Sequence, residues 1–395
     1  MSKKPIEPSH FPFFDYRRYT FSLGLDTREG VWLSGHSASR FDPARSGMVV
    51  EGDMVQQSRT AYEKIGAILK AAGLSFKDVV RTVDYVTPSG IEEYASTAVV
   101  RRETFGEDPP ATSTVVVNSL LRPEALIEIE AVAHRGKHAP VDPGWPTDGL
   151  FRSPARRAGD LLYISAQLPV RPGTDRVVVT GDIVAQARQI YDNAGALLRA
   201  AGLGWENLVK TVDFLTPEGL PAYRETGVVR RDFLGHAFPA ATGIIMKRLA
   251  HPDALLQVEF VASSARRETV NPGWSRYDKL TYVPAVRAGN LLFLAGQGSL
   301  NPNTNAIEHV GDVVAQTRYV YQNIGKVLAA AGAGPEAVVK TVEFVTPEGL
   351  PRYRATASVR QEFFKAPFPA ATGLVCDRLL RPEMLIEVDA MAVLS

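Results

Sequence analysis

The chain has 395 residues, of which 45% are hydrophobic and 22% are charged, and its formal net charge is +1. This is the composition of a globular protein, long enough for two to four domains. The near balance of charges disfavours nucleic acid or an anionic membrane as the main partner, because phosphate binding relies on clustered positive charge. The only cysteine is Cys376, which excludes an intrachain disulfide and favours a cytoplasmic location.

Several landmarks recur three times in the same order, about 130 residues apart. Ala-Ala-Gly occurs at 71–73, 200–202 and 330–332. The string FPAATG occurs at 238–243 and 368–373, and a related string, PPATST, occurs at 109–114. Landmarks in one order at one spacing are the mark of internal repeats. They predict three domains, which cover residues 1–140, 141–268 and 269–395.

The N-terminal segment 1–19, MSKKPIEPSHFPFFDYRRY, has charges and prolines where a signal peptide needs an apolar core. It is too aromatic for a plain disordered leader. We expect it to pack across the last repeat or another protomer. No stretch farther along approaches about 18 apolar residues without charges, so no membrane span is predicted.

Each repeat predicts the same order of elements. A β-rich run such as VWLSGHSA (31–38) comes first, and an aspartate then caps a helix that ends at the glycine of Ala-Ala-Gly. An alternating strand and a TPSG or TPEG turn lead to a second helix, and two strands close the unit. The resulting order, β-β-α-β-α-β-β, predicts an α+β fold. The capping residues are Asp53, Asp182 and Asp312.

The last strand of each repeat indicates how the units assemble. In LIEIEAVA (126–133), Glu128 and Glu130 lie on one face and Ile127 and Ile129 on the other. A sheet with helices on one face needs a cover on its second face. Three linked units provide it by closing into an intramolecular pseudo-trimer, with helices outside a central β-barrel. Clefts between neighbouring repeats are then the expected ligand sites.

These patterns resemble the reactive-intermediate deaminase (RidA/YjgF) family over essentially residues 20–395. The most specific match is PAATGLVCDRLLRPEMLIEVDAMA (369–392). The resemblance implies a chorismate-mutase-like unit that usually forms homotrimers with active sites between subunits. It also implies hydrolysis of an enamine or imine to a carbonyl compound and ammonia, without a metal or cofactor. This chain looks like such a trimer fused into one polypeptide, either self-contained or paired as a homodimer.

The main departure from the family concerns the arginine that clamps the substrate carboxylate. Thr112, Ala241 and Ala371 occupy that position, so a substrate unlike the simple 2-imino acids is expected. Arginines on the second helix are candidate replacements, and the alternative is that they form surface ion pairs with nearby acids. The candidate arginines are Arg101, Arg230 and Arg360, and the nearby acids are Glu103, Asp232 and Glu362.

The candidate catalytic residues also come from the resemblance. The family acid that positions or activates the attacking water matches Glu128 and Glu387, whereas repeat 2 has Gln257, which cannot take a proton. His36 is a third candidate, as an acid or base near neutrality. It stands where the other repeats carry a glutamine. The remaining candidate substrate contacts are Gln167, Gln297, Thr114, Thr242 and Thr372.

The leading hypothesis is therefore a cofactor-free hydrolytic deaminase of an enamine or imine intermediate. A 2-aminomuconate-type compound from aromatic degradation is the substrate favoured by family analogy. One alternative is a chorismate-type hydrolase or lyase on the same pseudo-trimeric fold. The other is a non-catalytic protein that binds small molecules or acts like a chaperone.

Overall fold

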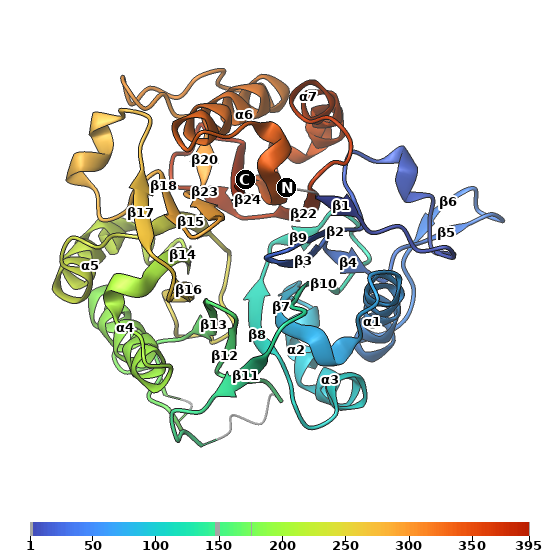
Figure 1. Cartoon of the computed structure of the whole chain (residues 1–395), viewed down its shortest axis with the longest axis horizontal. Coiled ribbons are helices and arrows are strands. Elements are labelled where there is room, and N and C mark those ends of the chain that lie inside the picture. The colour runs from blue at the N-terminus through green and yellow to red at the C-terminus, as the bar shows by residue number, and fades with distance from the viewer. Residues whose placement is uncertain (1–2, 147–150, 175, 395) are drawn as a thin grey trace.

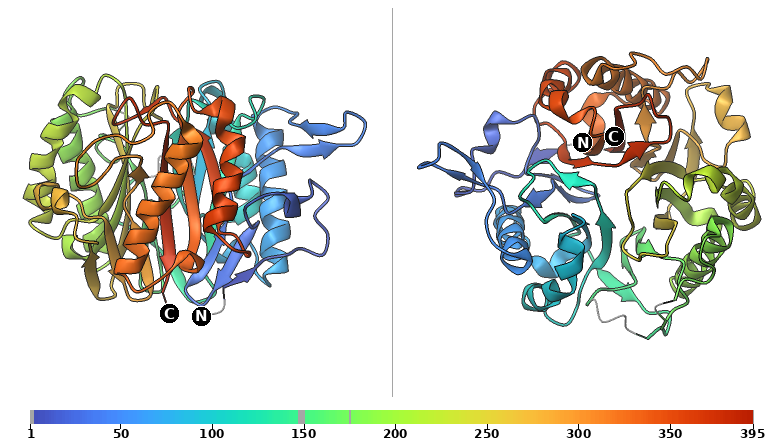
Figure 2. Two further views of the ribbon diagram at one scale, coloured as in Figure 1. Left: turned by 90° about the horizontal axis from the view of Figure 1, so that it is seen from above. Right: turned by 180° about the vertical axis from the view of Figure 1, so that it is seen from behind.

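The computed structural model describes residues 3–146, 151–174 and 176–394. Three similar units surround a common centre, with their strands inside and their long helices outside (Figure 1). The side view shows the sheets as an inner layer and places the two chain ends close together (Figure 2). Within the described ranges, no helix is long and apolar enough to cross a membrane.

The first sheet has the strand order β1-β2-β3-β10-β7-β8, and β4 also pairs with β10. The parallel pair β7–β8 and the antiparallel pair β7–β10 place the FPAATG-type strand beside the alternating strands. A separate hairpin, β5–β6, projects from the body at the right of Figure 1. The bounds are β1 Lys4–Pro5, β2 Gly24–Thr27, β3 Gly30–Leu33, β4 His36–Ser37, β5 Arg40–Asp42, β6 Gly47–Val49, β7 Val79–Val86, β8 Ala111–Val116 and β10 Ile127–Ala133.

The second sheet, β11-β12-β13-β16-β14-β15-β23, repeats this arrangement. Its first strand adds one element to the predicted order and crosses the predicted boundary after residue 140. Its last strand comes from the third repeat. The bounds are β11 His138–Val141, β12 Ala155–Ala158, β13 Leu161–Gln167, β14 Leu208–Leu215, β15 Ala240–Ile245, β16 Leu256–Ser263 and β23 Arg378–Leu379.

The third sheet, β17-β18-β19-β24-β21-β22-β9, has the same form, and β20 pairs with β24. Its first strand crosses the predicted boundary after residue 268, and its last strand comes from the first repeat. The bounds are β9 Ser119–Leu120, β17 Arg267–Val270, β18 Ala285–Ala288, β19 Leu291–Leu294, β20 Gln297–Gly298, β21 Val338–Val345, β22 Ala370–Val375 and β24 Ile386–Val393.

The long helices confirm the predicted caps. Asp53, Asp182 and Asp312 each accept hydrogen bonds from backbone N–H groups in the first helical turn. The glycines after the helices have positive φ angles, as expected past a helix end. The helices are α1 Met54–Ala71, α4 Ile183–Ala200 and α6 Val313–Ala330.

The predicted second helix exists in each repeat, but it starts with tighter turns. The α-helical parts are α2 Gly90–Glu93, α3 Ala98–Phe105, α5 Gly227–Leu234 and α7 Ala357–Phe363. The 3₁₀ segments before them are η3 Tyr94–Thr97, η5 Leu220–Thr226 and η8 Leu350–Thr356. Short 3₁₀ turns elsewhere are η1 Tyr16–Arg18, η2 Phe76–Asp78, η4 Trp205–Asn207, η6 Ser275–Lys279 and η7 Pro335–Ala337.

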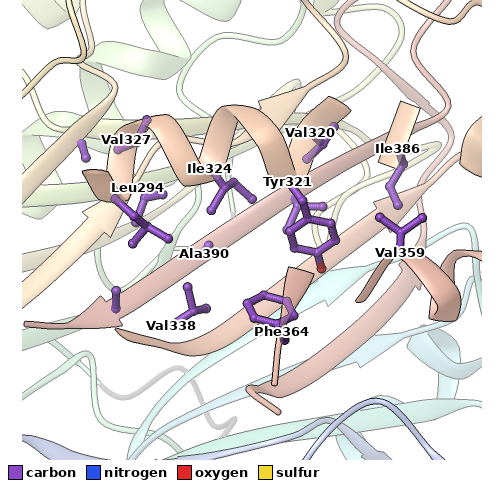
Figure 3. Close-up of a cluster of buried hydrophobic side chains, with 14 of the residues drawn as sticks. Leu294, Val320, Tyr321, Ile324, Val327, Val338, Val359, Phe364, Ile386 and Ala390 are labelled. Atoms are coloured by element: carbon purple, nitrogen blue, oxygen red, sulfur yellow. The ribbon is translucent and has the colours of Figure 1, made fainter. Parts of the chain in front are cut away.

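Each sheet buries one face against its own helices. In the third repeat, Val320, Ile324 and Val327 of α6 point toward the strands, where Leu294 and Ile386 are fully buried (Figure 3). Burying such side chains stabilises the unit by about 1.5–3 kcal/mol each. The packing explains why the helices carry apolar residues at helical spacing and lie on the outside.

The other face of each sheet points to the centre, where opposite charges pair across the repeats. These residues come from the alternating strands, and burying them is tolerable because each acid has a cationic partner. The pairs are Lys340–Glu130 at 2.9 Å, Lys210–Asp389 at 2.7 Å and Arg81–Glu259 at 3.0 Å.

The predicted central β-barrel is not found. Among the described residues, the strands form three large separate sheets and the small β5–β6 hairpin. Neighbouring repeats are joined by the exchanged strands β9 and β23 and by isolated bridges such as Ser22–Ala370. Because no continuous ladder joins the facing sheet edges, space for clefts remains between them.

Candidate functional site

Each FPAATG-type strand faces the first strands of the next repeat, so three equivalent clefts arise. We name them by their state: the bridged cleft lies between repeats 1 and 2, the covered cleft between repeats 3 and 1, and the open cleft between repeats 2 and 3. Equivalent backbone hydrogen bonds join the walls of the covered and open clefts. Gly35 N donates to Ala371 O in the covered cleft and Gly296 N donates to Ala241 O in the open cleft, both at 3.2 Å.

The bridged cleft is closed by the glutamine that replaces the family acid. Gln257 is 2% exposed, and its Nε2 donates across the cleft to Thr114 O at 2.7 Å. The neighbouring Gln167 is also committed, since its Nε2 donates to Ser165 O at 2.7 Å. An amide in this place cannot exchange a proton near neutral pH, so the bridged cleft lacks the family's acid–base group.

A glycine accompanies the acid in the other two clefts. A methyl group at Gly35 would overlap Glu128 Oε1, and one at Gly296 would overlap Glu387 Oε1. The carboxyl groups therefore lie directly against the backbone, which only glycine permits. Ala166 takes this place in the bridged cleft. The sequence carries a signal for this difference. A glycine follows Ser34 and Ala295 in the two acid-bearing clefts, whereas Ala166 follows Ser165 in the third.

The covered cleft holds Glu128, and the N-terminal segment packs over it. The ring centroids of Phe13 and Phe14 lie 5.3 and 5.4 Å from Lys64 Nζ. Phe11 lies 6.4 Å from the His36 ring. The segment thus packs chiefly on the first repeat, and Lys3 Nζ donates to Val338 O of the third at 3.0 Å. The sequence predicts packing across the last repeat or another protomer. The Lys3 contact agrees with the first of these, whereas the aromatic residues pack on the first repeat.

Burial changes the chemistry of the covered cleft. Desolvation, then the charges of Lys64 and Lys340, lower the pKa of His36 to about 3. Its imidazole is therefore neutral near pH 7. The expectation that His36 acts as an acid or base near neutrality is wrong for this packed state. Desolvation also raises the pKa of Glu128 to about 7 and lowers that of Lys64 to about 7.

The open cleft has a volume of about 970 Å³ and contains Glu387 in its wall. Glu387 is 5% exposed, and its pKa is raised to about 8 by desolvation and by the nearby Asp389, against a smaller opposing effect of Lys210. It is therefore largely protonated at neutral pH. Six cationic and two acidic residues line this cleft, namely Arg224, Arg230, Arg231, Arg276, Lys279, Arg381, Asp278 and Glu387.

Two tyrosines at this cleft escaped the sequence analysis. Tyr277 and Tyr282 lie between β17 and β18 of the third sheet, and Tyr282 lines the cleft. Burial raises the pKa of both phenols. The Tyr277 hydroxyl lies beside Gln297, while Tyr282 is close enough to Arg276, Glu387, Arg230 and Arg381 to feel their charges. A signal existed in the recurrence of DYRRYTF (15–21) as RYDKLTY (276–282).

The second-helix arginines are held in buried ion pairs. Arg230 Nη2 donates to Asp213 and, at 3.0 Å, to Tyr223 Oη, while also lining the open cleft. The other repeats pair Arg101 with Asp84 and Arg360 with Glu343. The acids expected as surface partners bind first-helix arginines instead, in the pairs Glu103–Arg59, Asp232–Arg188 and Glu362–Arg318. The reason is that the second-helix arginines face the sheet.

The candidate threonines connect the cleft walls to the central ion pairs. Thr242 Oγ1 donates to Asp389 at 2.6 Å and accepts from Lys210 at 2.9 Å. Thr372 makes the same contacts with Glu130 and Lys340. Ser113, not Thr114, is their equivalent in the first repeat, because it pairs in the same register of the parallel strands.

Comparison with known proteins agrees with this arrangement. The family model described as Endoribonuclease L-PSP matches residues 17–135, 149–264 and 277–394. A RutC family protein of Synechocystis is 37% identical over 114 residues, 29% of this chain and 85% of that protein. The 3-aminoacrylate deaminase RutC of Acinetobacter baylyi is 35% identical over 111 residues, 28% of this chain and 85% of that enzyme.

A solved chorismatase resembles the chain in fold. The TM-score is 0.53 at 16% identity, and the likeness covers 91% of this chain and 99% of the chorismatase. The three family-model matches, by contrast, rest on sequence and together span most of the chain. The chain therefore belongs to the RidA/YjgF/RutC family and carries the family's unit three times.

Proposed function

We propose that the chain is a hydrolytic deaminase of an enamine or imine and that the reaction takes place in the open cleft. The observation that carries this proposal is Glu387, a nearly buried carboxyl group with a pKa of about 8 in the wall of a large, cation-lined cleft. The relative named as a 3-aminoacrylate deaminase supports the reaction class. A 2-aminomuconate-type compound remains the proposed substrate.

The protonated Glu387 carboxyl suits the first step of this chemistry. It donates its proton to the terminal carbon of the enamine double bond, which leaves an iminium ion and a carboxylate. The carboxylate then accepts a proton from water as the water oxygen attacks the iminium carbon. That proton then passes to nitrogen. As the carbinolamine collapses, its hydroxyl proton returns to the Glu387 carboxylate, so that ammonia leaves and a carbonyl compound remains. One water is consumed and Glu387 ends as it began.

The other clefts are less suited to this reaction. Gln257 cannot take part in proton transfer and is bonded across the bridged cleft. Glu128 has a raised pKa too, but the aromatic N-terminal segment packs over its cleft. We therefore propose Glu387 as the acid and base, and leave Glu128 and His36 as a second pair that would act only if the segment moved.

The test is ammonia release and loss of ultraviolet absorbance with two substrates, 2-aminoacrylate generated in situ and 2-aminomuconate. Glu387→Gln should lower the rate about 10²- to 10⁴-fold, the range typical for losing a general acid–base. Glu128→Gln is the matched control in the covered cleft and should leave activity within about twofold. Equal loss in both variants would contradict the assignment to the open cleft. Binding without turnover would favour the non-catalytic alternative.

The second candidate is hydrolysis of a chorismate-type enol ether. The excess of cations in the open cleft favours it, because such a substrate is a dianion. The chemistry is also parallel, since an enol ether is protonated at its terminal carbon before water adds. Chorismate in the same assay would separate the two, as pyruvate would form without ammonia.

We also propose that the three repeats are the single-chain counterpart of the family's homotrimer, in a cytoplasmic protein. Light scattering of the purified chain distinguishes a self-contained monomer from a homodimer.

A further inference from the structure

The open cleft contains an arginine with an unused hydrogen-bond donor. Arg276 lies in η6, between β17 and β18 of the third sheet, and lines the cleft. Its Nε is buried and has no hydrogen-bond partner in the described part of the chain. A buried donor without a partner is unfavourable, and an anionic ligand would supply the missing acceptor. Arg230, the cleft arginine favoured by the sequence, is by contrast already occupied by Asp213 and Tyr223.

The position of Arg276 is fixed by its neighbours. Its guanidinium lies over the Tyr277 ring, 5.3 Å from the centroid, so its plane is held by stacking. The charges of Arg276 and Glu387 both act on the pKa of the Tyr282 phenol, the first lowering it and the second raising it. The guanidinium, the phenol and the carboxyl of the proposed acid all line this cleft.

The equivalent places in the other repeats carry no cation. Arg276 lies seven residues before Val283, which bridges to Ala240. Counting seven residues before the equivalent bridging residues, Ser22 and Ser153, leads to Asp15 and Pro146. The arginine is thus specific to the cleft that is open, which is not expected of a residue needed only to fold a repeat.

We propose that Arg276 is the carboxylate-binding residue of this enzyme, replacing the family arginine that is absent at Thr112, Ala241 and Ala371, and that the substrate carries a second anionic group. This inference rests on the proposed function. The remaining cations are exposed and line the same cleft, namely Arg224, Arg231, Lys279 and Arg381. A volume of about 970 Å³ exceeds the needs of a three-carbon enamine. The substrate class is an unsaturated dicarboxylate with its reacting nitrogen near one carboxylate.

Binding of unreactive probes tests this inference separately from turnover. The probes are cis,cis-muconate, a dianion, and 2,4-hexadienoate, which has the same carbon chain with a methyl group in place of one carboxylate. Calorimetry on the full chain should show the dianion binding at least about tenfold more tightly than the monoanion, as expected for one more charged contact.

Arg276→Gln should weaken muconate binding roughly 10- to 100-fold, and Arg276→Lys should restore part of it, because an ammonium group keeps the charge but loses the bidentate geometry. Arg266→Gln removes the same charge from an exposed residue outside the cleft and should leave affinity unchanged. Unaltered melting temperatures will show that the variants fold.

Wild-type affinity for muconate in Arg276→Gln would overturn the inference, as would equal binding of the two probes by the wild type. These outcomes do not depend on turnover. If no enamine is hydrolysed but muconate binding still requires Arg276, the proposed function fails while the anion site stands.

Discussion

Replacing Glu387 with glutamine should stabilise the protein at alkaline pH while it abolishes activity. The pKa of this carboxyl is 4.5 in its ordinary state and about 8 in the folded chain, mainly because it is desolvated. Below pH 4.5 both states hold the proton. Between the two values the folded state keeps a proton that the unfolded chain releases, so stability falls as pH rises, and above about 8 the full cost is present. Glutamine has nearly the same shape and does not ionise.

The magnitude follows from the two pKa values. Their difference, about 3.5, multiplied by about 1.36 kcal/mol gives an upper limit of about 5 kcal/mol. Water in the open cleft will reduce it, so we expect the stabilisation at pH 9 to exceed that at pH 5 by about 2–4 kcal/mol.

The assay is urea unfolding of the wild type and the variant at several pH values. Glu362→Gln is the control, because its pKa is lowered by Arg318, so the sign of its effect should be opposite. It is exposed, so the effect should be small. A difference between wild type and Glu387→Gln that does not change with pH, or that favours the wild type at pH 9, would refute the reasoning.

Three further outcomes are expected. In a pH–rate profile, the rate with an enamine should fall as pH rises through about 8, where Glu387 loses its proton. Asp389→Asn should move this decline to lower pH, because it removes a negative charge that raises the pKa of Glu387. Gly296→Ala should inactivate the enzyme, because its methyl group overlaps Glu387 Oε1, whereas Gly35→Ala in the covered cleft should lower the melting temperature and preserve the rate. Gln257→Glu should destabilise the chain by about 1–3 kcal/mol in urea unfolding, because it replaces the buried donor that binds Thr114 O. It should not raise activity, and a gain in rate would show that the bridged cleft is competent.

Local physical chemistry made much of the fold predictable. The threefold recurrence revealed the units, the capping aspartates marked the starts of the long helices, and alternation placed Glu128 and Glu130 on one face of a strand. Each of these depends on residues close together in the chain. The same local signal, a glycine opposed to an alanine, separates the clefts of Glu128 and Glu387 from that of Gln257.

The tertiary structure alone decided which cleft is open and what its groups can do. Sequence reasoning offered Arg101, Arg230 and Arg360 as anion anchors, but a buried acid of the same repeat already binds each of them. It treated His36 as an acid–base near neutrality, but packing by the N-terminal segment and two lysines keeps the imidazole neutral. It passed over Arg276, because the cleft that this residue lines forms only when repeats 2 and 3 pack together. The walls of each cleft come from segments more than 100 residues apart. Desolvation and long-range charge, which set the pKa values there, exist only once those segments have packed together.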